Sequence, residues 1–156
     1  MFKGTGTAII TPFNDDLSVD YSALSRFVRY QLESGINSLV VLGTTGEAST
    51  INNYEREKIL SDVVEQVNNK VPVIVGTGSN NTQKVAEYNL LAEKCGADGL
   101  LIVNPYYNKS TQAGIIAHYK YISERTELPI ILYNVPSRTG MNMLPETVLE
   151  IQSSCF

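Results

Sequence analysis

A five-residue motif of small and hydroxyl-bearing residues is the first candidate for a chemical site. Residues 43–47 read Gly-Thr-Thr-Gly-Glu and follow an apolar run, residues 38–42, that is typical of a buried strand. The two glycines can adopt positive φ, which would turn backbone N–H groups into a concavity suited to a carboxylate or a phosphate. The hydroxyls of Thr44 and Thr45 add donors and acceptors for a proton relay. A strand-ending turn without a ligand explains the pentapeptide equally well, so other residues must decide.

Two further residues have side chains suited to the chemistry of a small carboxylic acid. Tyr133 ends another apolar run, and its hydroxyl can pass protons if Thr44 and Tyr107 supply neighbouring hydroxyls. Arg138 follows in a loop, where its guanidinium can hold a substrate carboxylate in a bidentate fork. The ordinary alternatives are a tyrosine at the edge of the core and a solvated surface arginine. Each residue taken alone leaves these alternatives open.

The other polar candidates have simpler interpretations. Tyr106 and Tyr107 are adjacent, and tyrosine is enriched at subunit contacts. His118 lies within a predicted helix and is interpreted as structural or surface-exposed, whereas Glu47 is expected to brace its own loop. Three residues near helix starts are interpreted as caps or solvated charges, namely Asn80, Lys84 and Arg56.

Length and composition indicate a globular protein with one domain, residues 1–156, and no internal boundary. Hydrophobic residues make up 43% of the 156 residues and charged residues 18%. The net charge of -4 and the pI near 5.0 argue against nucleic acid or an anionic membrane as a partner. The first residues lack the apolar core of a signal peptide, and no stretch reaches transmembrane length. A cytoplasmic location is therefore expected.

The sequence predicts neither a metal site nor a bound cofactor. His118 is the only histidine, and Cys95 and Cys155 stand far apart. Zinc sites require clusters of such ligands, and disulfide frameworks require several cysteines.

Apolar runs alternate with helical patterns at a period of about thirty residues, which predicts a parallel sheet covered by helices. The strands are predicted at residues 5–10, 38–42, 71–75, 99–103 and 129–132, the first of them apolar on both faces. The starts of the five helices are predicted from Asp20, from Asn52 with Glu55, from Asn80 or Asn81, from Ser110 or Thr111, and from Pro145.

Two α/β architectures fit this alternation. One is a complete flavodoxin-like open sheet, and the other is the first five units of an eight-unit (β/α) barrel, truncated before strand six. An open sheet gathers its ligand residues at one switch point, whereas a barrel collects them from all its strand ends. Candidate residues follow every predicted strand here, including Thr11, residues 76–78 and Tyr133. This even spread favours the barrel.

Four motifs together strongly resemble the dihydrodipicolinate synthase family. They are residues 43–47, the Gly-Thr-Gly of residues 76–78, the Pro-Tyr-Tyr-Asn of residues 105–108, and the Tyr-Asn-Val-Pro-Ser-Arg-Thr-Gly of residues 133–140. The resemblance implies a TIM barrel of the class I pyruvate-dependent aldolases. It also implies condensation of pyruvate with L-aspartate 4-semialdehyde through a lysine Schiff base, which belongs to lysine and diaminopimelate biosynthesis.

The resemblance assigns roles to individual residues. It implies that the N–H groups of Thr44 and Thr45 hold the pyruvate carboxylate. Tyr133, Thr44 and Tyr107 would form the proton relay, with Tyr107 reaching in from the neighbouring subunit of a tight dimer. Arg138 would bind the carboxylate of the semialdehyde. The complete enzyme is expected to be a homotetramer of two tight dimers, and neither a metal nor a cofactor is expected.

One departure from the family concerns the Schiff-base lysine, which lies on a strand beyond the sequence given. None of the seven lysines present ends a predicted strand. Because the lysine amine makes the enamine, the chain alone is expected to be inactive. A barrel cut after five strands is also expected to associate with itself, with a missing C-terminal piece or with a chaperone. The alternatives are another pyruvate-dependent aldolase, such as a sialic-acid lyase-like enzyme, and a truncated paralogue that only binds or assembles.

A second departure concerns feedback by lysine. The resemblance places an allosteric or interface region at Asn80, Tyr106, Ala48 and Ser49. Histidines and a glutamate of lysine-sensitive members are matched here by Asn53, Arg56 and Lys84. A lysine in place of an acidic residue would repel a cationic effector, so weak or absent lysine inhibition of the complete enzyme is expected.

Overall fold

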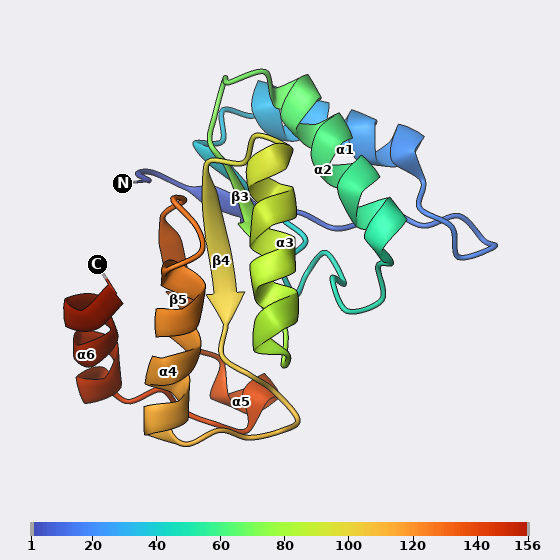
Figure 1. The fold of residues 1–156 in the computed structure, drawn as a ribbon. Helices are drawn as coiled ribbons and strands as arrows, with labels where there is room; N and C mark the ends of the chain where they lie inside the picture. Colours follow the sequence, from blue (N-terminus) through green and yellow to red (C-terminus); the bar gives the residue numbers. More distant parts are fainter. Residues whose placement is uncertain (1, 156) are drawn as a thin grey trace.

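Five βα units form one continuous parallel sheet (Figure 1). The computed structural model describes residues 2–155. Every predicted strand is present, because each apolar run is long enough to cross the sheet and is bounded by turn residues. The strands are β1 (Gly6–Ala8), β2 (Ser38–Val41), β3 (Val73–Gly76), β4 (Gly99–Val103) and β5 (Ile130–Tyr133).

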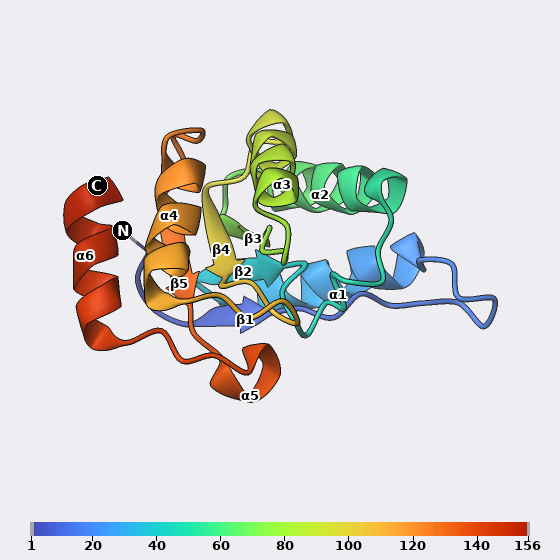
Figure 2. The same cartoon turned by 60° about the horizontal axis from the view of Figure 1, so that its bottom comes forward.

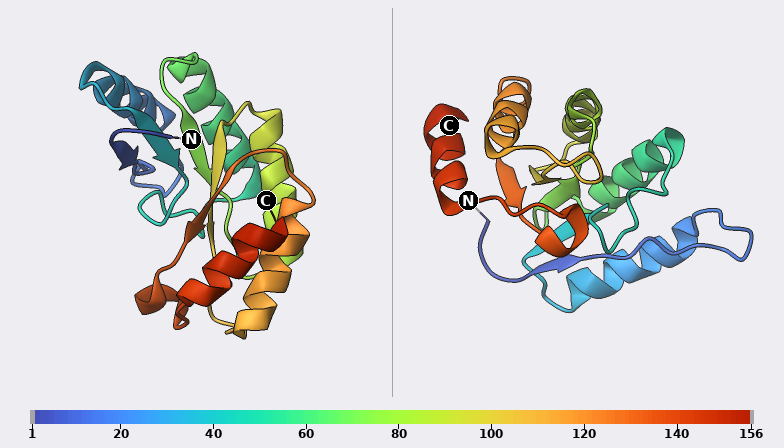
Figure 3. Two further views of the ribbon diagram at one scale, coloured as in Figure 1. Left: turned by 90° about the vertical axis from the view of Figure 1, so that its left-hand side faces the viewer. Right: turned by 90° about the horizontal axis from the view of Figure 1, so that it is seen from below.

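The order of the strands decides between the two predicted architectures. They lie in the order β1-β2-β3-β4-β5, and each pairs in parallel with the next. A flavodoxin-like sheet has the order 2-1-3-4-5, with helices on both faces. Here the strands follow an arc, and α1 to α4 cover its outer side (Figure 3, right). The partial barrel is therefore confirmed, and the flavodoxin-like alternative is wrong.

The main helices begin where their capping residues predict. The side chain of Asp20 accepts a hydrogen bond from the N–H of Ala23, and Asn52 and Glu55 form the expected capping box. Of the paired alternatives, Asn81 and Thr111 are the caps. The helices are α1 (Tyr21–Glu33), α2 (Asn53–Val67), α3 (Thr82–Lys94), α4 (Gln112–Ser123) and α6 (Pro145–Cys155), and α6 packs beside α4 (Figure 2).

The core lies between the sheet and its helices. Alternate residues of the three central strands point toward the helices on the outer side of the sheet and are at most 1% exposed. They are Leu39, Val41, Val73, Val75, Leu100 and Ile102. The first strand does not fit the prediction that both of its faces are buried, because Gly6 and Ala8 are exposed. Gly6 and Ala8 pair with Ser38 and Val40, so they lie on the inner side of the sheet, opposite to the outer side that α1 to α4 cover.

A short helix, α5 (Pro136–Thr139), occupies a segment that was predicted to be a loop. Pro136 fits its first turn because proline has a preset φ and needs no N–H partner there. Gly140 closes the turn at φ 66°, with its N–H bonded to the carbonyl of Pro136. Four residues give little periodic signal, so the sequence pattern could not reveal this helix. It lies at the end of the sheet to which the β4 arrow points (Figure 1).

No helix among residues 2–155 is both long enough and apolar enough to cross a membrane.

Candidate functional site

A cavity of about 250 Å³ opens at the carboxyl ends of β2 to β5. Chemistry in (β/α) barrels is placed at this end of the strands. Its walls combine apolar side chains from the strands with polar residues from the loops that follow them. The lining residues are Leu42, Gly43, Thr44, Ala48, Ser49, Gly76, Gly78, Leu101, Val103, Tyr106, Tyr133, Val135, Arg138 and Thr139.

The loop of residues 43–50, called the 43–50 loop below, folds into tight turns after β2. The N–H of Gly46 donates to the carbonyl of Gly43, and the N–H of Glu47 donates to that of Thr44, each at 3.1 Å. The prediction of positive φ at the two glycines is wrong. Leu42 (φ 55°) and Glu47 (φ 52°) adopt that conformation instead, while neither Gly43 nor Gly46 does.

Gly46 is required for a different reason, because neighbouring backbone atoms leave little space for a Cβ atom. A Cβ atom at Gly46 would lie 3.1 Å from the carbonyl oxygen of Ile9 and 3.2 Å from the Cα of Leu42. At Gly76, a Cβ would clash with the carbonyl oxygen of Leu42. These glycines therefore let the loop ends after β1, β2 and β3 approach closely, which brings their backbones together around the cavity.

The predicted carboxylate-binding amides are available for a ligand. Thr44 and Thr45 are both exposed, and their N–H groups have no hydrogen bond to any part of the chain that the structure describes. Thr44 lines the cavity, whereas Thr45 lies in the same loop but outside the lining.

Two other predicted residues meet Thr44 at this cavity. Tyr133 ends β5 beside Val103 of β4 and is half-buried. Arg138 comes from α5 and is exposed, and no carboxylate within residues 2–155 forms an ion pair with it. One cavity therefore contains the loop with Thr44, the phenol of Tyr133 and the guanidinium of Arg138, which forms no ion pair within residues 2–155. This arrangement is suited to binding a small carboxylate and to proton transfer.

The predicted contact residues divide into two groups. Tyr106, Ala48 and Ser49 line the cavity. Tyr107 does not line the cavity and is 91% exposed. Asn80 also lies outside the lining, and its carbonyl accepts a hydrogen bond from Nδ2 of Asn108 at 3.1 Å. A Tyr133–Thr44–Tyr107 relay is thus not assembled within one copy of the described chain.

Two polar residues are more deeply buried than the sequence interpretation held. Arg56, interpreted as a cap or solvated charge, is 3% exposed, and burial lowers the pKa of its guanidinium. The sequence contained a signal for the burial of Arg56, because its helical spacing places it on the same stripe as Ile59, Leu60 and Val63. The surface alternative for His118 is also wrong. It is 4% exposed, its Nδ1 lies 2.8 Å from Oγ1 of Thr82, and burial lowers its pKa to about 4.

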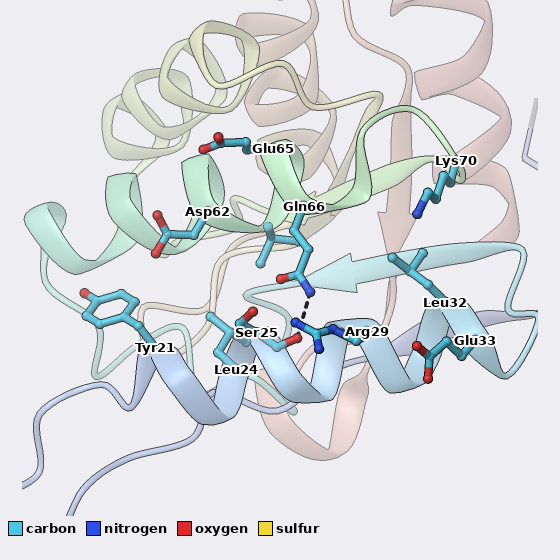
Figure 4. A pocket seen from close by; sticks show the side chains of 11 residues that line it. Tyr21, Leu24, Ser25, Arg29, Leu32, Glu33, Asp62, Glu65, Gln66 and Lys70 are labelled. Carbon is cyan, nitrogen blue, oxygen red and sulfur yellow. Dashed lines mark hydrogen bonds between the residues drawn. The ribbon is translucent and has the colours of Figure 1, made fainter.

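A larger groove of about 660 Å³ lies between α1 and α2 on the outer side of the sheet (Figure 4). The side chain of Gln66 bridges it by donating to the carbonyl of Ser25 at 2.8 Å. Its lining includes both basic residues, Arg29 and Lys70, and acidic ones, so charges of both signs are mixed along its walls. None of the predicted site residues lies there, and the cavity at the strand ends remains the candidate site.

Within residues 2–155, no three His, Cys, Asp or Glu side chains come together in a way that could hold a metal ion.

Fold and cavity define the class of protein, a partial (β/α) barrel whose site lies at the carboxyl ends of its strands. The sequence matches the Dihydrodipicolinate synthetase family over residues 1–155, and the chain belongs to this family. The 4-hydroxy-tetrahydrodipicolinate synthase of Thermotoga neapolitana is 59% identical over 153 residues, which are 98% of this chain and 52% of the relative. The chain thus spans about half the length of the curated relatives that it matches.

Solved structures agree with this assignment. The dihydrodipicolinate synthase of Thermotoga maritima superposes with a TM-score of 0.96 at 56% identity, covering 99% of this chain and 52% of the other. The chloride-inhibited synthase of Acinetobacter baumannii, solved in complex with pyruvate, gives a TM-score of 0.95 at 43% identity, covering 97% of this chain and 52% of the other.

Proposed function

We propose that this chain supplies the pyruvate-binding half of the active site of a 4-hydroxy-tetrahydrodipicolinate synthase, a lyase of lysine biosynthesis. The observation that carries the proposal is the convergence of Thr44, Tyr133 and Arg138 on one cavity. The name of the Thermotoga relative supports the reaction, and the pyruvate complex of the Acinetobacter relative supports the ligand.

Each of the three residues has a distinct chemical role in this proposal. The free N–H groups of Thr44 and Thr45 hold the pyruvate carboxylate. The hydroxyl of Tyr133 exchanges protons with the reacting carbon and oxygen atoms through Oγ1 of Thr44, and Tyr107 of a second copy completes the relay. Arg138, at the mouth of the cavity, holds the carboxylate of L-aspartate 4-semialdehyde. A homo-oligomer is therefore part of the proposal.

The cavity lacks a nucleophile for Schiff-base chemistry. No lysine is among its lining residues in the described chain. We therefore propose that a polypeptide of these 156 residues binds pyruvate without reacting with it, and that the lysine of the complete enzyme comes from outside this sequence.

We expect pyruvate to shift the amide resonances of Thr44 and Thr45 in the 156-residue polypeptide, with a Kd on the order of 1 mM. Acetone, which has the ketone but no carboxylate, should shift neither amide. Borohydride added with pyruvate should leave the mass unchanged. Absence of the shifts would contradict pyruvate binding, and a reduced adduct would show that a lysine of this chain is the nucleophile.

Arg138 distinguishes the proposed reaction from that of other pyruvate aldolases. We consider a hybrid enzyme in which this chain replaces the matching part of the Thermotoga neapolitana relative. Arg138→Met should lower kcat/KM for the semialdehyde about a hundredfold, because a charge-assisted bidentate contact is lost. The rate of borohydride-trapped Schiff-base formation with pyruvate should change less than about threefold, since that half-reaction does not use the contact.

Arg26→Met is the matched control, because Arg26 is exposed on α1 and hydrogen-bonds only to Ser22 among the described residues. Equal losses in both half-reactions of Arg138→Met would argue against semialdehyde binding by Arg138 and would favour a different aldolase.

A further inference from the structure

Arg56 is a buried cation in an unfavourable place. It is 3% exposed and lies in the first turn of α2, where the helix dipole disfavours positive charge. Among residues 2–155 no carboxylate forms an ion pair with it. Burial of an unpaired charge is costly, and a guanidinium remains charged in proteins. The contacts of Arg56 must therefore offset the free-energy cost of burying its charge.

Those contacts join two walls of the candidate cavity. Nη2 of Arg56 donates to the carbonyl of Ala48 at 2.8 Å, and Nη1 donates to the carbonyl of Gly76 at 3.3 Å. The ring of Tyr88 covers the guanidinium, with its centroid 4.0 Å from Cζ. Ala48 lies in the 43–50 loop and Gly76 ends β3, and both line the cavity. One buried side chain therefore links the loop after β2 to the end of the next strand.

A second buried side chain holds the same loop from the other side. Oγ1 of Thr11 donates to the carbonyl of Gly46 at 2.7 Å. Because a peptide group is planar and trans, a held carbonyl also fixes the direction of the following N–H. The held carbonyls of Gly46 and Ala48 thus direct the N–H groups of Glu47 and Ser49. The free N–H groups of Thr44 and Thr45 share their peptides with the carbonyls of Gly43 and Thr44, which accept hydrogen bonds from the N–H groups of Gly46 and Glu47 within the same held loop.

We propose that Arg56 is a positioning residue of the active site. Its guanidinium ties the 43–50 loop to the end of β3 and keeps the carboxylate-binding backbone in register with Tyr133 and Arg138. This role deepens the proposed function and rests on it, because it matters for activity only if the loop binds the pyruvate carboxylate. The tie itself can be tested without any ligand.

The test measures amide hydrogen exchange of the 156-residue polypeptide and of its Arg56→Met and Arg56→Lys variants. Loss of two hydrogen bonds from a charged donor should speed exchange of the hydrogen-bonded amides in this loop, those of Gly46, Glu47 and Thr50, about tenfold in Arg56→Met. A lysine ammonium can reach one of the carbonyls, so Arg56→Lys should show a smaller increase, about threefold. Exchange in α1 and α4 should not change. Arg29→Met, at an exposed arginine in the outer groove, is the matched control.

A pyruvate titration of the same variants separates the tie from the proposed function. Arg56→Met should raise the Kd for pyruvate about tenfold, Arg56→Lys should partly restore it, and Arg29→Met should leave it unchanged. If the unsubstituted chain does not bind pyruvate, the proposed function fails and the exchange data alone decide whether Arg56 holds the loop. If all amides of the Arg56→Met variant exchange rapidly, that variant is unfolded. The Arg56→Lys variant then decides whether Arg56 holds the loop. Unchanged exchange in residues 43–50 of a folded Arg56 variant would overturn the proposal.

Discussion

Replacing Tyr133 with phenylalanine in the hybrid enzyme is expected to lower kcat by about a hundredfold to a thousandfold. The substitution removes one hydroxyl and keeps the ring that packs at the end of β5 beside Val103. General acid–base catalysis by a positioned side chain contributes on the order of 10² to 10⁴ to the rate. The KM for pyruvate should change less than about threefold, because in the proposed site the backbone amides of the 43–50 loop, and not the phenol, hold the carboxylate. Steady-state kinetics with both substrates give the two constants.

Tyr30→Phe is the matched control for this experiment. Tyr30 lies on α1 and is 63% exposed, and it does not line the cavity. The control should retain the full kcat of the hybrid. Retention of more than half of kcat in Tyr133→Phe would remove Tyr133 from the relay and leave Thr44 without its proposed partner.

Lowering the pH from 7 to 4 is expected to reduce the free energy of unfolding by about 3 kcal/mol through His118 alone. Burial lowers the pKa of this imidazole from 6.5 to about 4 in the folded chain. Between these two values the unfolded chain binds a proton that the folded chain excludes. The stabilisation is therefore complete above pH 6.5 and is lost as the pH falls toward 4. Denaturant unfolding at a series of pH values measures it.

The His118→Gln variant isolates this contribution. Glutamine fills much of the same space and can still hydrogen-bond to Oγ1 of Thr82, but it does not titrate. Because His118 is the only histidine, the difference between the two stability curves contains no other imidazole. Carboxylates titrate in both proteins and cancel. Parallel curves between pH 7 and 4.5 would show that His118 opens to solvent before it is protonated.

Local signals explain most of what the sequence could predict about the fold. The apolar runs identified all five strands, and the caps at Asp20 and Asn52 marked where two helices begin. Each of these signals involves residues that are only a few positions apart, so it can be read directly from the sequence. The order of the strands depends on contacts between distant units, and periodicity alone left two architectures open. The spread of candidate residues over all strand ends favoured the barrel, and the strand order confirms it, because that spread reflects the shape of the whole sheet.

The site was predicted less completely, for physical reasons that differ between residues. Thr44, Tyr133 and Arg138 do share a cavity, as expected from their places after strands. Gly46 was selected correctly but for the wrong reason, since the close approach of Ile9 that requires it cannot be read from residues 43–47. Arg56 was interpreted as solvated because of its charge, although its position on a buried stripe indicated otherwise. The roles of the site residues remain predictions.

The consecutive order of the strands has a consequence for folding during synthesis. Gly6 pairs with Ser38 and Leu39 with Val73, so each strand finds its partner one βα unit later along the chain. Folding slows when contacts join residues that are distant in sequence, because closing a long loop loses more entropy. The sheet can therefore grow one unit at a time as the polypeptide leaves the ribosome. The residues that hold the 43–50 loop, Thr11, Arg56 and Gly76, all belong to the first three strands and their connections, so they are available early in that growth.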